Sequence, residues 1–223
     1  LDLRVMLLNR SGHTLSVRAS VSRSSKVPTL NDRYWGGEHL YLQSEKSLTA
    51  EGGLDYSWLK DSWSAEAFVT LYRSEVDDWI RWLPAGQVWR PQNIPEVLSH
   101  GAEAGLKVTK EISDFKISLN TNYSFTNIVT VTPIWPEDPA KGEQLAYQPK
   151  HSLRVSLRAD LDKWSLYGGV YYTGTRTTLD IYDILPSYVL ADIGLIYKFS
   201  LFGKNFTANG VVKNVTDASY QNV

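Results

Sequence analysis

The sequence predicts an all-β fold, a partial antiparallel transmembrane β-barrel of about ten strands, and three observations lead to this prediction. Polar and apolar residues alternate along most of the 223-residue chain. The alternating segments have the length of tilted strands that cross a bilayer. The connections between them are short and long in turn, as in bacterial outer-membrane barrels, which have short periplasmic turns and longer external loops.

The composition limits the class of protein. The chain has no cysteine and a formal net charge of -1 at pH 7, so it offers neither a disulfide framework nor a basic field for nucleic acid. Its 8 Trp and 13 Tyr are residue types that favour a membrane–water interface. No apolar run in the chain reaches the ~18 residues of a transmembrane helix. We therefore expect strands to cross the bilayer.

The first four predicted strands are 2–8, 14–23, 47–59 and 62–76. In the third strand the apolar row consists of Leu48, Ala50, Leu54, Tyr56 and Trp58, and the polar row consists of Thr49, Glu51, Asp55 and Ser57. Successive side chains on a strand point to opposite faces, so this segment has one apolar wall and one polar wall.

The other six predicted strands are 96–110, 114–126, 148–161, 163–175, 187–200 and 205–215. Phe115 and Ile117 flank Lys116 in one of the clearest cases, and Leu153 and Val155 flank Arg154 in another. The period of two returns in each segment, which indicates strands with one face in lipid.

The connections alternate in length. Tight turns are expected at Asn9–His13, Lys60–Asp61, Ser113, Asp162 and Leu201–Lys204, and long loops at Ser24–Lys46, Asp77–Pro95, Asn127–Lys150 and Gly174–Pro186. A soluble β-sandwich or β-helix, which is the alternative, has no reason to keep this order. Trp58, Trp63 and Trp164 lie beside tight turns on the apolar row, which predicts an interfacial aromatic belt, although a sandwich core could also hold them.

The predicted inner face is strongly charged. It carries Glu51, Asp55, Glu66, Glu103, Lys107, Lys116, Arg154, Arg158, Asp160 and Asp192. Charges of both signs cannot fill a small dry barrel, so they indicate a wide lumen that is hydrated or plugged by protein. About ten strands do not close a wide barrel, and an open edge cannot face lipid. The expectation is that the chain is one part of a larger barrel.

Several short motifs resemble those of TonB-dependent outer-membrane receptors. They are the segment Ser22–Trp35, Glu45-Lys46-Ser47, Gly101-Ala102-Glu103, Gly174-Thr175-Arg176, and Asn214-Val215-Thr216-Asp217 followed by Tyr220. Their order and spacing extend the resemblance over nearly the whole chain.

The resemblance implies a barrel of roughly 22 strands whose lumen is plugged. Residues 1–223 would be the C-terminal part of that barrel, with the plug domain and the last strand outside the chain. The implied location is the bacterial outer membrane. The implied partners are the lipid bilayer, the TonB system acting through the plug, and a small-molecule ligand; a surface lipoprotein that caps the loops is a further candidate.

In this family the external loops capture ligands, so the large aromatics and arginines of the long loops are the candidate binding residues. They are Tyr34, Trp35, Trp79, Arg81, Trp82, Trp89, Arg90, Trp135 and Tyr182. Arginines between aromatics, as in the 79–90 segment, could hold an acidic or amide-rich ligand. The alternative is that these aromatics pack on one another and stiffen the loops.

The long loops carry slightly more acidic than basic side chains, unlike a funnel for a strongly anionic ferric siderophore. This charge and the layout of the motifs favour a receptor for cobalamin or another corrinoid. A ferric siderophore or haem receptor is the first alternative, and a passive porin or a protein-binding, adhesive barrel is the second. The four histidines are dispersed and no zinc or phosphate-loop motif occurs, so we expect no enzyme, no cofactor and no metal site.

Overall fold

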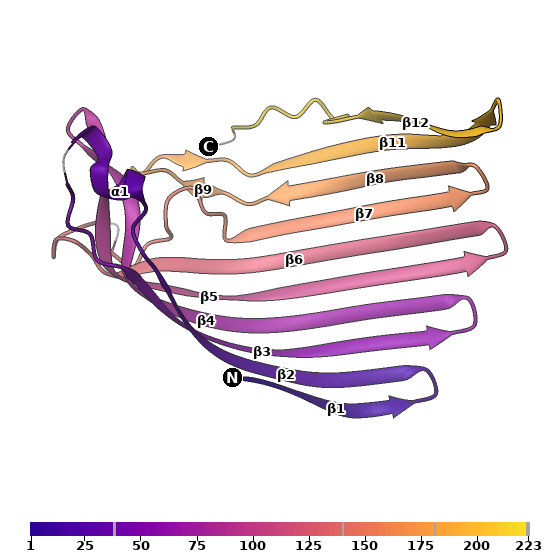
Figure 1. The fold of residues 1–223 in the computed structure, drawn as a ribbon, viewed down its shortest axis with the longest axis horizontal. Helices are drawn as coiled ribbons and strands as arrows, with labels where there is room; N and C mark the ends of the chain where they lie inside the picture. The colour runs from indigo at the N-terminus through magenta and orange to yellow at the C-terminus, as the bar shows by residue number, and fades with distance from the viewer. Residues whose placement is uncertain (38, 140, 181, 222–223) are drawn as a thin grey trace.

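The computed structural model describes residues 1–37, 39–139, 141–180 and 182–221. Its long strands are β1 (Asp2–Arg10), β2 (His13–Lys26), β3 (Glu45–Lys60), β4 (Trp63–Ala85), β5 (Val88–Ile112), β6 (Phe115–Thr132), β7 (His151–Leu161), β8 (Trp164–Thr173), β11 (Tyr188–Leu201) and β12 (Lys204–Val212). These ten strands of the described chain form one sheet, in which each strand pairs antiparallel with the next in that order (Figure 1). The predicted strands are confirmed.

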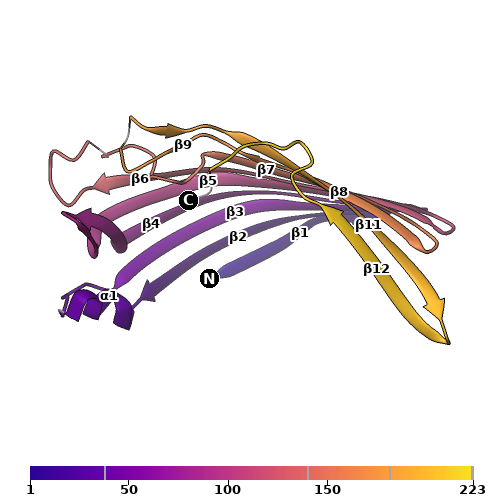
Figure 2. The ribbon, with the colours of Figure 1, turned by 90° about the horizontal axis from the view of Figure 1, so that it is seen from above.

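The smaller elements lie at one end of the sheet. They are α1 (Leu30–Tyr34), the 3-10 turn η1 (Trp35–Gly37), and the short strands β9 (Arg176–Thr177) and β10 (Ile184–Leu185), which pair with each other. Figure 2 shows that the sheet is curved and twisted, with α1 beside its loop-bearing end. Among the described residues, no helix has the length and hydropathy that a membrane span requires.

Two-residue turns connect the strands at the other end of the sheet. The strand pairing encloses Ser11–Gly12, Asp61–Ser62, Ser113–Asp114, Asp162–Lys163 and Phe202–Gly203. The first residue of each turn has a positive φ, from 50° at Asp61 and Asp162 to 53° at Ser11. Turns of this kind match the right-handed twist of the flanking strands. The tight turns expected from the sequence are therefore confirmed.

The prediction of one long loop is wrong. The segment 77–95 is not a loop, because β4 and β5 stay paired as far as Ala85 and Val88 and form a hairpin beyond the sheet. Its content of proline and tryptophan predicted irregular structure. Proline has no N–H to donate to a neighbouring strand. It is tolerated in the projecting hairpin because the outer edges of these strand segments pair with no further strand. The remaining long connections are residues 27–44, 133–150 and 174–187, the last of which includes β9 and β10.

The strand register places the predicted charged residues on one face. Glu66 pairs with both Ser57 and Lys107, and Lys107 pairs with Asn120. Ion pairs connect neighbouring strands on this face: Asp55 Oδ2 lies 3.3 Å from Arg18 Nε and 3.6 Å from Arg4 Nη2. Arg18 also donates a hydrogen bond to Thr70 Oγ1. Asp55 thus joins arginines of two other strands on the inner wall.

The opposite face is apolar and unburied. Leu71 is 61% exposed, and Leu54 and Leu166 are each 50% exposed. A continuous apolar surface of this kind is an aggregation liability in water but suits a lipid environment. Near the tight turns, Trp164 stacks on Tyr197 with 4.2 Å between ring centroids, and Tyr197 is followed by Phe199 at 5.7 Å. This row agrees with the predicted aromatic belt.

Aromatic rings cover glycines on the inner wall. Phe68 pairs with Gly105, and Tyr72 pairs with Gly101. A Cβ atom on Gly105 would lie 2.1 Å from Cε1 of Phe68, so the ring lies flat across the glycine. Cross-strand packing of an aromatic on a glycine fixes the strand register and keeps the ring close to the wall.

A small hydrophobic core lies where the sheet meets the loops. Ile94, Val97 and Leu145 are buried in it, and Val76 and Trp79 pack against them. Leu145 comes from the loop after β6, and the other four residues come from β4 and β5. The core therefore joins the projecting hairpin to that loop and gives the loop-bearing end a fixed shape.

The glycine packing leads to the first prediction. A Cβ on Gly101 would lie 2.1 Å from the carbonyl oxygen of Phe125, whereas a Cβ on Gly52 would meet no atom within 4 Å. Gly101→Ala should lower the free energy of unfolding of the full-length protein by about 1–3 kcal/mol, as overpacking does. The measurement is the temperature at which the compact, heat-modifiable band is lost in detergent.

Gly52→Ala is the matched control, and it should shift that temperature little, because a surface change without contacts alters stability by only about 0.5 kcal/mol. Equal midpoints for the two variants would contradict the packing of this wall.

Candidate functional site

The hairpin formed by the ends of β4 and β5 divides the loop region into two sides. Asp78 has a positive φ of 57°. Val76 and Trp79 pack in the same core although their positions differ by an odd number, so the two faces of β4 exchange at Asp78. In Figure 2 the tip of β4 lies between α1 and the loop that follows β6. Each face of the hairpin therefore has its own loop.

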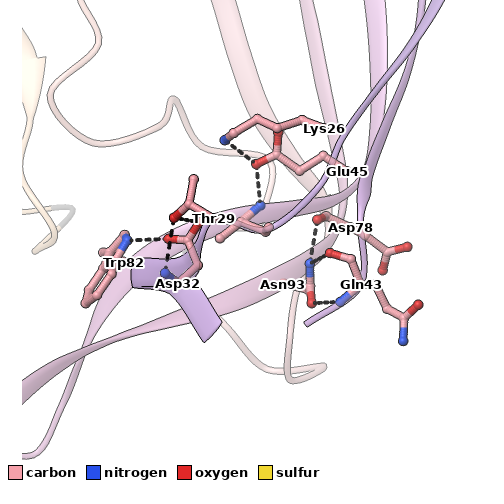
Figure 3. Close-up of polar contacts among 9 residues, drawn as sticks. Lys26, Thr29, Asp32, Gln43, Glu45, Asp78, Trp82 and Asn93 are labelled. Atoms are coloured by element: carbon pink, nitrogen blue, oxygen red, sulfur yellow. Dashed lines mark hydrogen bonds and ion pairs between the residues drawn. The ribbon is translucent and has the colours of Figure 1, made fainter. Parts of the chain in front are cut away.

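The first side is organised by Asp32 (Figure 3). The Trp82 indole N–H donates to Asp32 Oδ1 at 3.1 Å, and the Thr29 hydroxyl donates to Asp32 Oδ2 at 2.7 Å. Thr29 is the N-cap of α1, and the two residues form a capping box. Trp35 meets Trp82 edge to face, with 5.0 Å between ring centroids. Helix α1 is thus attached to the hairpin through one carboxylate.

Burial of Asp32 opposes its ionisation, but the hydrogen bonds from Thr29 and Trp82 outweigh burial. Together they hold the pKa of Asp32 below its ordinary value of 3.8. A carboxylate that accepts several hydrogen bonds is stabilised in its charged form. Asp32 therefore carries its charge in the folded loop at neutral pH.

Two further contacts fix the same loop (Figure 3). The Gln43 N–H donates to Asn93 Oδ1 at 2.9 Å, and Asn93 Nδ2 donates back to the Gln43 carbonyl at 3.1 Å. The Ile80 N–H donates to Glu45 Oε1 at 3.0 Å, and this carboxylate also receives Lys26 Nζ at 3.1 Å. The loop 27–44 is therefore joined to the hairpin near its start, through Asp32, and near its end, through Gln43.

The second side contains a pocket of about 280 Å³. The hairpin, the loop after β6 and the segment after β9 all contribute to its walls, which include Arg81, Leu83, Ile94, Trp135, Glu143 and Leu179. Its lining is mainly apolar with a few charged groups, which is the usual character of a ligand site.

Gln144 holds the pocket loop in place. Its Oε1 accepts the Ile128 N–H at 3.0 Å, and its Nε2 donates to the Thr126 carbonyl at 3.2 Å. The Tyr147 N–H then donates to the Thr177 carbonyl on β9 at 2.7 Å. These bonds connect two loops that are distant in sequence, so the pocket wall is formed before any ligand arrives.

Arg81 is the cation of this pocket. Its guanidinium lies 5.9 Å from the centroid of the Trp79 ring, within the range of a cation–π contact. Burial lowers the pKa of Arg81, and Tyr147 partly offsets that effect. An arginine stays protonated in any protein environment, so a full positive charge lies in a partly dry pocket.

The predicted site residues fall into separate places. Trp79 and Arg81 lie on the pocket side and Trp82 on the α1 side, so the hairpin separates members of the cluster expected from the sequence. Trp89 and Arg90 are exposed near its tip, and all five are on strands rather than in a loop.

The other predicted residues are on the loops. Trp135 is half-exposed in the pocket wall, and Tyr182 is 86% exposed on the loop after β8. Trp35 packs on Trp82, and Tyr34 meets the ring of His39 with 5.2 Å between centroids. These two residues therefore pack on other rings, as the alternative interpretation expects, and whether they stiffen the loop or bind a ligand stays a prediction.

Sequence reasoning missed the polar residues that organise both sides, namely Asp32, Asn93 and Gln144. The spacing Thr29-x-x-Asp32 is a capping-box pattern and could have predicted α1. Asn93 and Gln144 form hydrogen bonds with backbone groups that are distant in sequence, and no local sequence pattern predicts such contacts. In the described part of the chain no three His, Asp or Glu side chains gather as a metal site.

Comparison with protein families gives one match. The model of the family described as "TonB dependent receptor-like, beta-barrel" matches residues 10–215. A search among curated proteins found no match.

Solved structures give the same fold. The ferric enterobactin receptor PfeA of Pseudomonas aeruginosa, solved as a point mutant, matches with a TM-score of 0.65 and 20% identity over 97% of this chain and 34% of that one. The copper transporter OprC matches with a TM-score of 0.69 and 14% identity over 98% of this chain and 33% of that one. The ferric preacinetobactin receptor BauA of Acinetobacter baumannii matches with a TM-score of 0.64 and 10% identity over 98% of this chain and 32% of that one. The chain spans about a third of the length of these proteins, and at such identities the likeness shows the fold.

The second prediction concerns Asp32. In Asp32→Asn the new NH₂ group would face the N–H and O–H donors of Thr29 at the place of Oδ2. Hydrogen-exchange protection of residues 29–37 and 39–44 in the full-length protein should fall roughly tenfold at pH 7, in line with the value of a cap and of hydrogen bonds to a charged group. Asp77→Asn, at an exposed position of β4, is the control and should leave protection unchanged.

The same contact has a pH dependence of defined sign. Because the folded pKa of Asp32 lies below 3.8, its contribution is present above that value and is lost as the pH falls through the lowered pKa. Protection factors of residues 29–37 and 39–44, corrected for intrinsic exchange rates, should therefore hold at pH 5 and fall only in stronger acid. Loss of protection between pH 7 and pH 5 would contradict this role of Asp32.

Proposed function

Because the chain belongs to the TonB-dependent receptor β-barrel family, we propose that it forms the part of an outer-membrane receptor that binds a scarce nutrient at its external loops. Barrels of this family lie in the outer membrane. The chain supplies both a wall in contact with lipid and a set of loops fixed to that wall.

The preformed pocket beside the β4–β5 hairpin carries this proposal. It is built from three segments distant in sequence, which Gln144 and the Tyr147–Thr177 bond tie together. A wall that only separates lipid from water has no need of such a structure. Rigid, partly apolar pockets with a few polar groups favour small-molecule binding, because little order has to be gained when the ligand arrives.

The inner wall supports passage of the bound ligand. It is polar along its length and has a hollow of about 430 Å³ lined by residues such as Asp55, Glu66 and Lys107. In the proposed receptor a plug domain fills the lumen, and the TonB system acts on that plug to release the ligand inward. A surface lipoprotein over the loops stays a prediction.

A metal complex is the cargo that we propose. The solved structures similar to this chain include two receptors named for ferric siderophores and one copper transporter. These names favour a siderophore type of cargo over the corrinoid suggested by the slightly acidic loops. The sequence argument used the layout of the motifs and the net charge of the loops, whereas a binding pocket acts through the few charges inside it.

The third prediction tests the hairpin. Replacing residues 79–94 of the full-length receptor by Asn-Gly removes the pocket wall and leaves the sheet part of β4 and β5 paired. Uptake of the cargo should be lost while the barrel still gives a heat-modifiable band. Ferric enterobactin, ferric preacinetobactin, copper and cyanocobalamin are the probes, each tested with and without an active TonB system.

An Asn-Gly replacement of Phe202–Gly203, a tight turn at the other end of the sheet, is the matched control and should keep uptake. Uptake that survives loss of the hairpin would contradict its role. Steady ion conductance with no need for TonB would indicate a porin instead, and tight binding of cyanocobalamin alone would favour the corrinoid cargo.

A further inference from the structure

Arg81 forms no ion pair with another described residue. Its side chain is half-buried between the hairpin and the pocket loop, and the surrounding wall includes Leu83, Ile94, Trp135 and Leu179. Among the described residues no carboxylate lies within ion-pair distance of Arg81, and its recorded contact is with the Trp79 ring. A guanidinium that is partly removed from water and has no anion in direct contact is unfavourable, so a bound anion would stabilise this site.

The size of the pocket limits what can enter. Its volume of about 280 Å³ is just below the ~300–1,000 Å³ range of sites that enclose a drug-sized ligand. A whole metal chelate is larger than that. The pocket therefore suits one arm of a ligand, with the rest of the molecule outside it.

Two carboxylates limit the charge of that arm. Asp138 and Glu143 line the same pocket as Arg81. Both lie on the loop after β6. One anionic group on the arm gains from the guanidinium, which can hold a planar anion with two parallel hydrogen bonds. A second anionic group would approach the two carboxylates, and such repulsion is a common source of specificity.

We propose that the pocket selects a monoanionic arm, an aromatic or apolar body that ends in a single carboxylate-like group, with Arg81 as the anion-binding residue and Glu143 as the residue that disfavours dianions. The assignment of the arm to a transported ligand rests on the receptor function proposed above. The charge preference of the pocket does not, since it can be measured without transport.

The test uses three probes that share a phenyl ring on a short aliphatic chain: 3-phenylpropionate with one charge, 3-phenylpropionamide with none, and benzylmalonate with two. Their binding to the full-length receptor in detergent is measured by saturation-transfer NMR and titration. The monoanion should bind about tenfold more tightly than the amide, as expected for a charge-assisted hydrogen-bonded pair, and more tightly than the dianion.

Three variants locate the effect. Arg81→Gln should make the monoanion and the amide equal, whereas Arg81→Lys should retain part of the preference, because lysine keeps the charge without the planar fork. Glu143→Gln should strengthen binding of benzylmalonate. Arg33→Gln, which changes an arginine of α1 on the other face of the hairpin, is the control and should leave all three affinities unchanged. A heat-modifiable band confirms that each variant is folded.

Equal binding of the amide and the monoanion to the unaltered receptor would overturn the proposal, as would a preference that survives Arg81→Gln. The expected preference in a receptor that transports none of the nutrient probes would support the pocket while rejecting the transport function. The two proposals therefore fail on different results.

Discussion

In the hydrocarbon of a bilayer, every backbone N–H and C=O group has to find its partner within the protein. The rest of this structure depends on that constraint. Continuous antiparallel pairing from β1 to β12 satisfies the backbone of the strands that lie between the two edges. It also fixes a register in which a shift of one residue would turn the apolar row of a strand into the lumen and its polar row into lipid. The cross-strand contacts of Arg18 with Asp55 and Thr70 reinforce that register.

The same register explains how the loop region is positioned. A hairpin that continues two strands of a rigid wall needs no separate support, and the positive φ of Asp78 exchanges its faces just as it leaves the sheet. One face then binds α1 through Asp32 and Trp82, and the other forms a pocket with Arg81 and the loop held by Gln144. The loops are thus arranged around a projecting part of the barrel, and the candidate site takes its geometry from the wall.

The sheet could be predicted from the sequence because its signal is local and repeated. Leu153 and Val155 on either side of Arg154 already imply two faces of opposite character. The hairpin could not be predicted in the same way, because its sequence contains Pro84, Pro91 and Pro95, which weaken the local strand signal. Its strands are held instead by the pairing of β4 with β5. Sequence spacing grouped Trp79 with Trp82, but both are on β4 and their positions differ by three, so strand alternation places them on opposite faces of the hairpin. The contacts of Asn93 and Gln144 depend on chain segments that meet only after folding.

The sheet has one wall that faces lipid and one that faces water. Spin labels on single cysteines placed in turn at residues 152–160 of β7, in the full-length receptor in lipid bilayers, test this most directly. The account predicts high accessibility to oxygen, which concentrates in lipid, at Leu153, Val155, Leu157 and Ala159, and low accessibility at the positions between them. Accessibility without a period of two, or a period with the opposite phase, would contradict it.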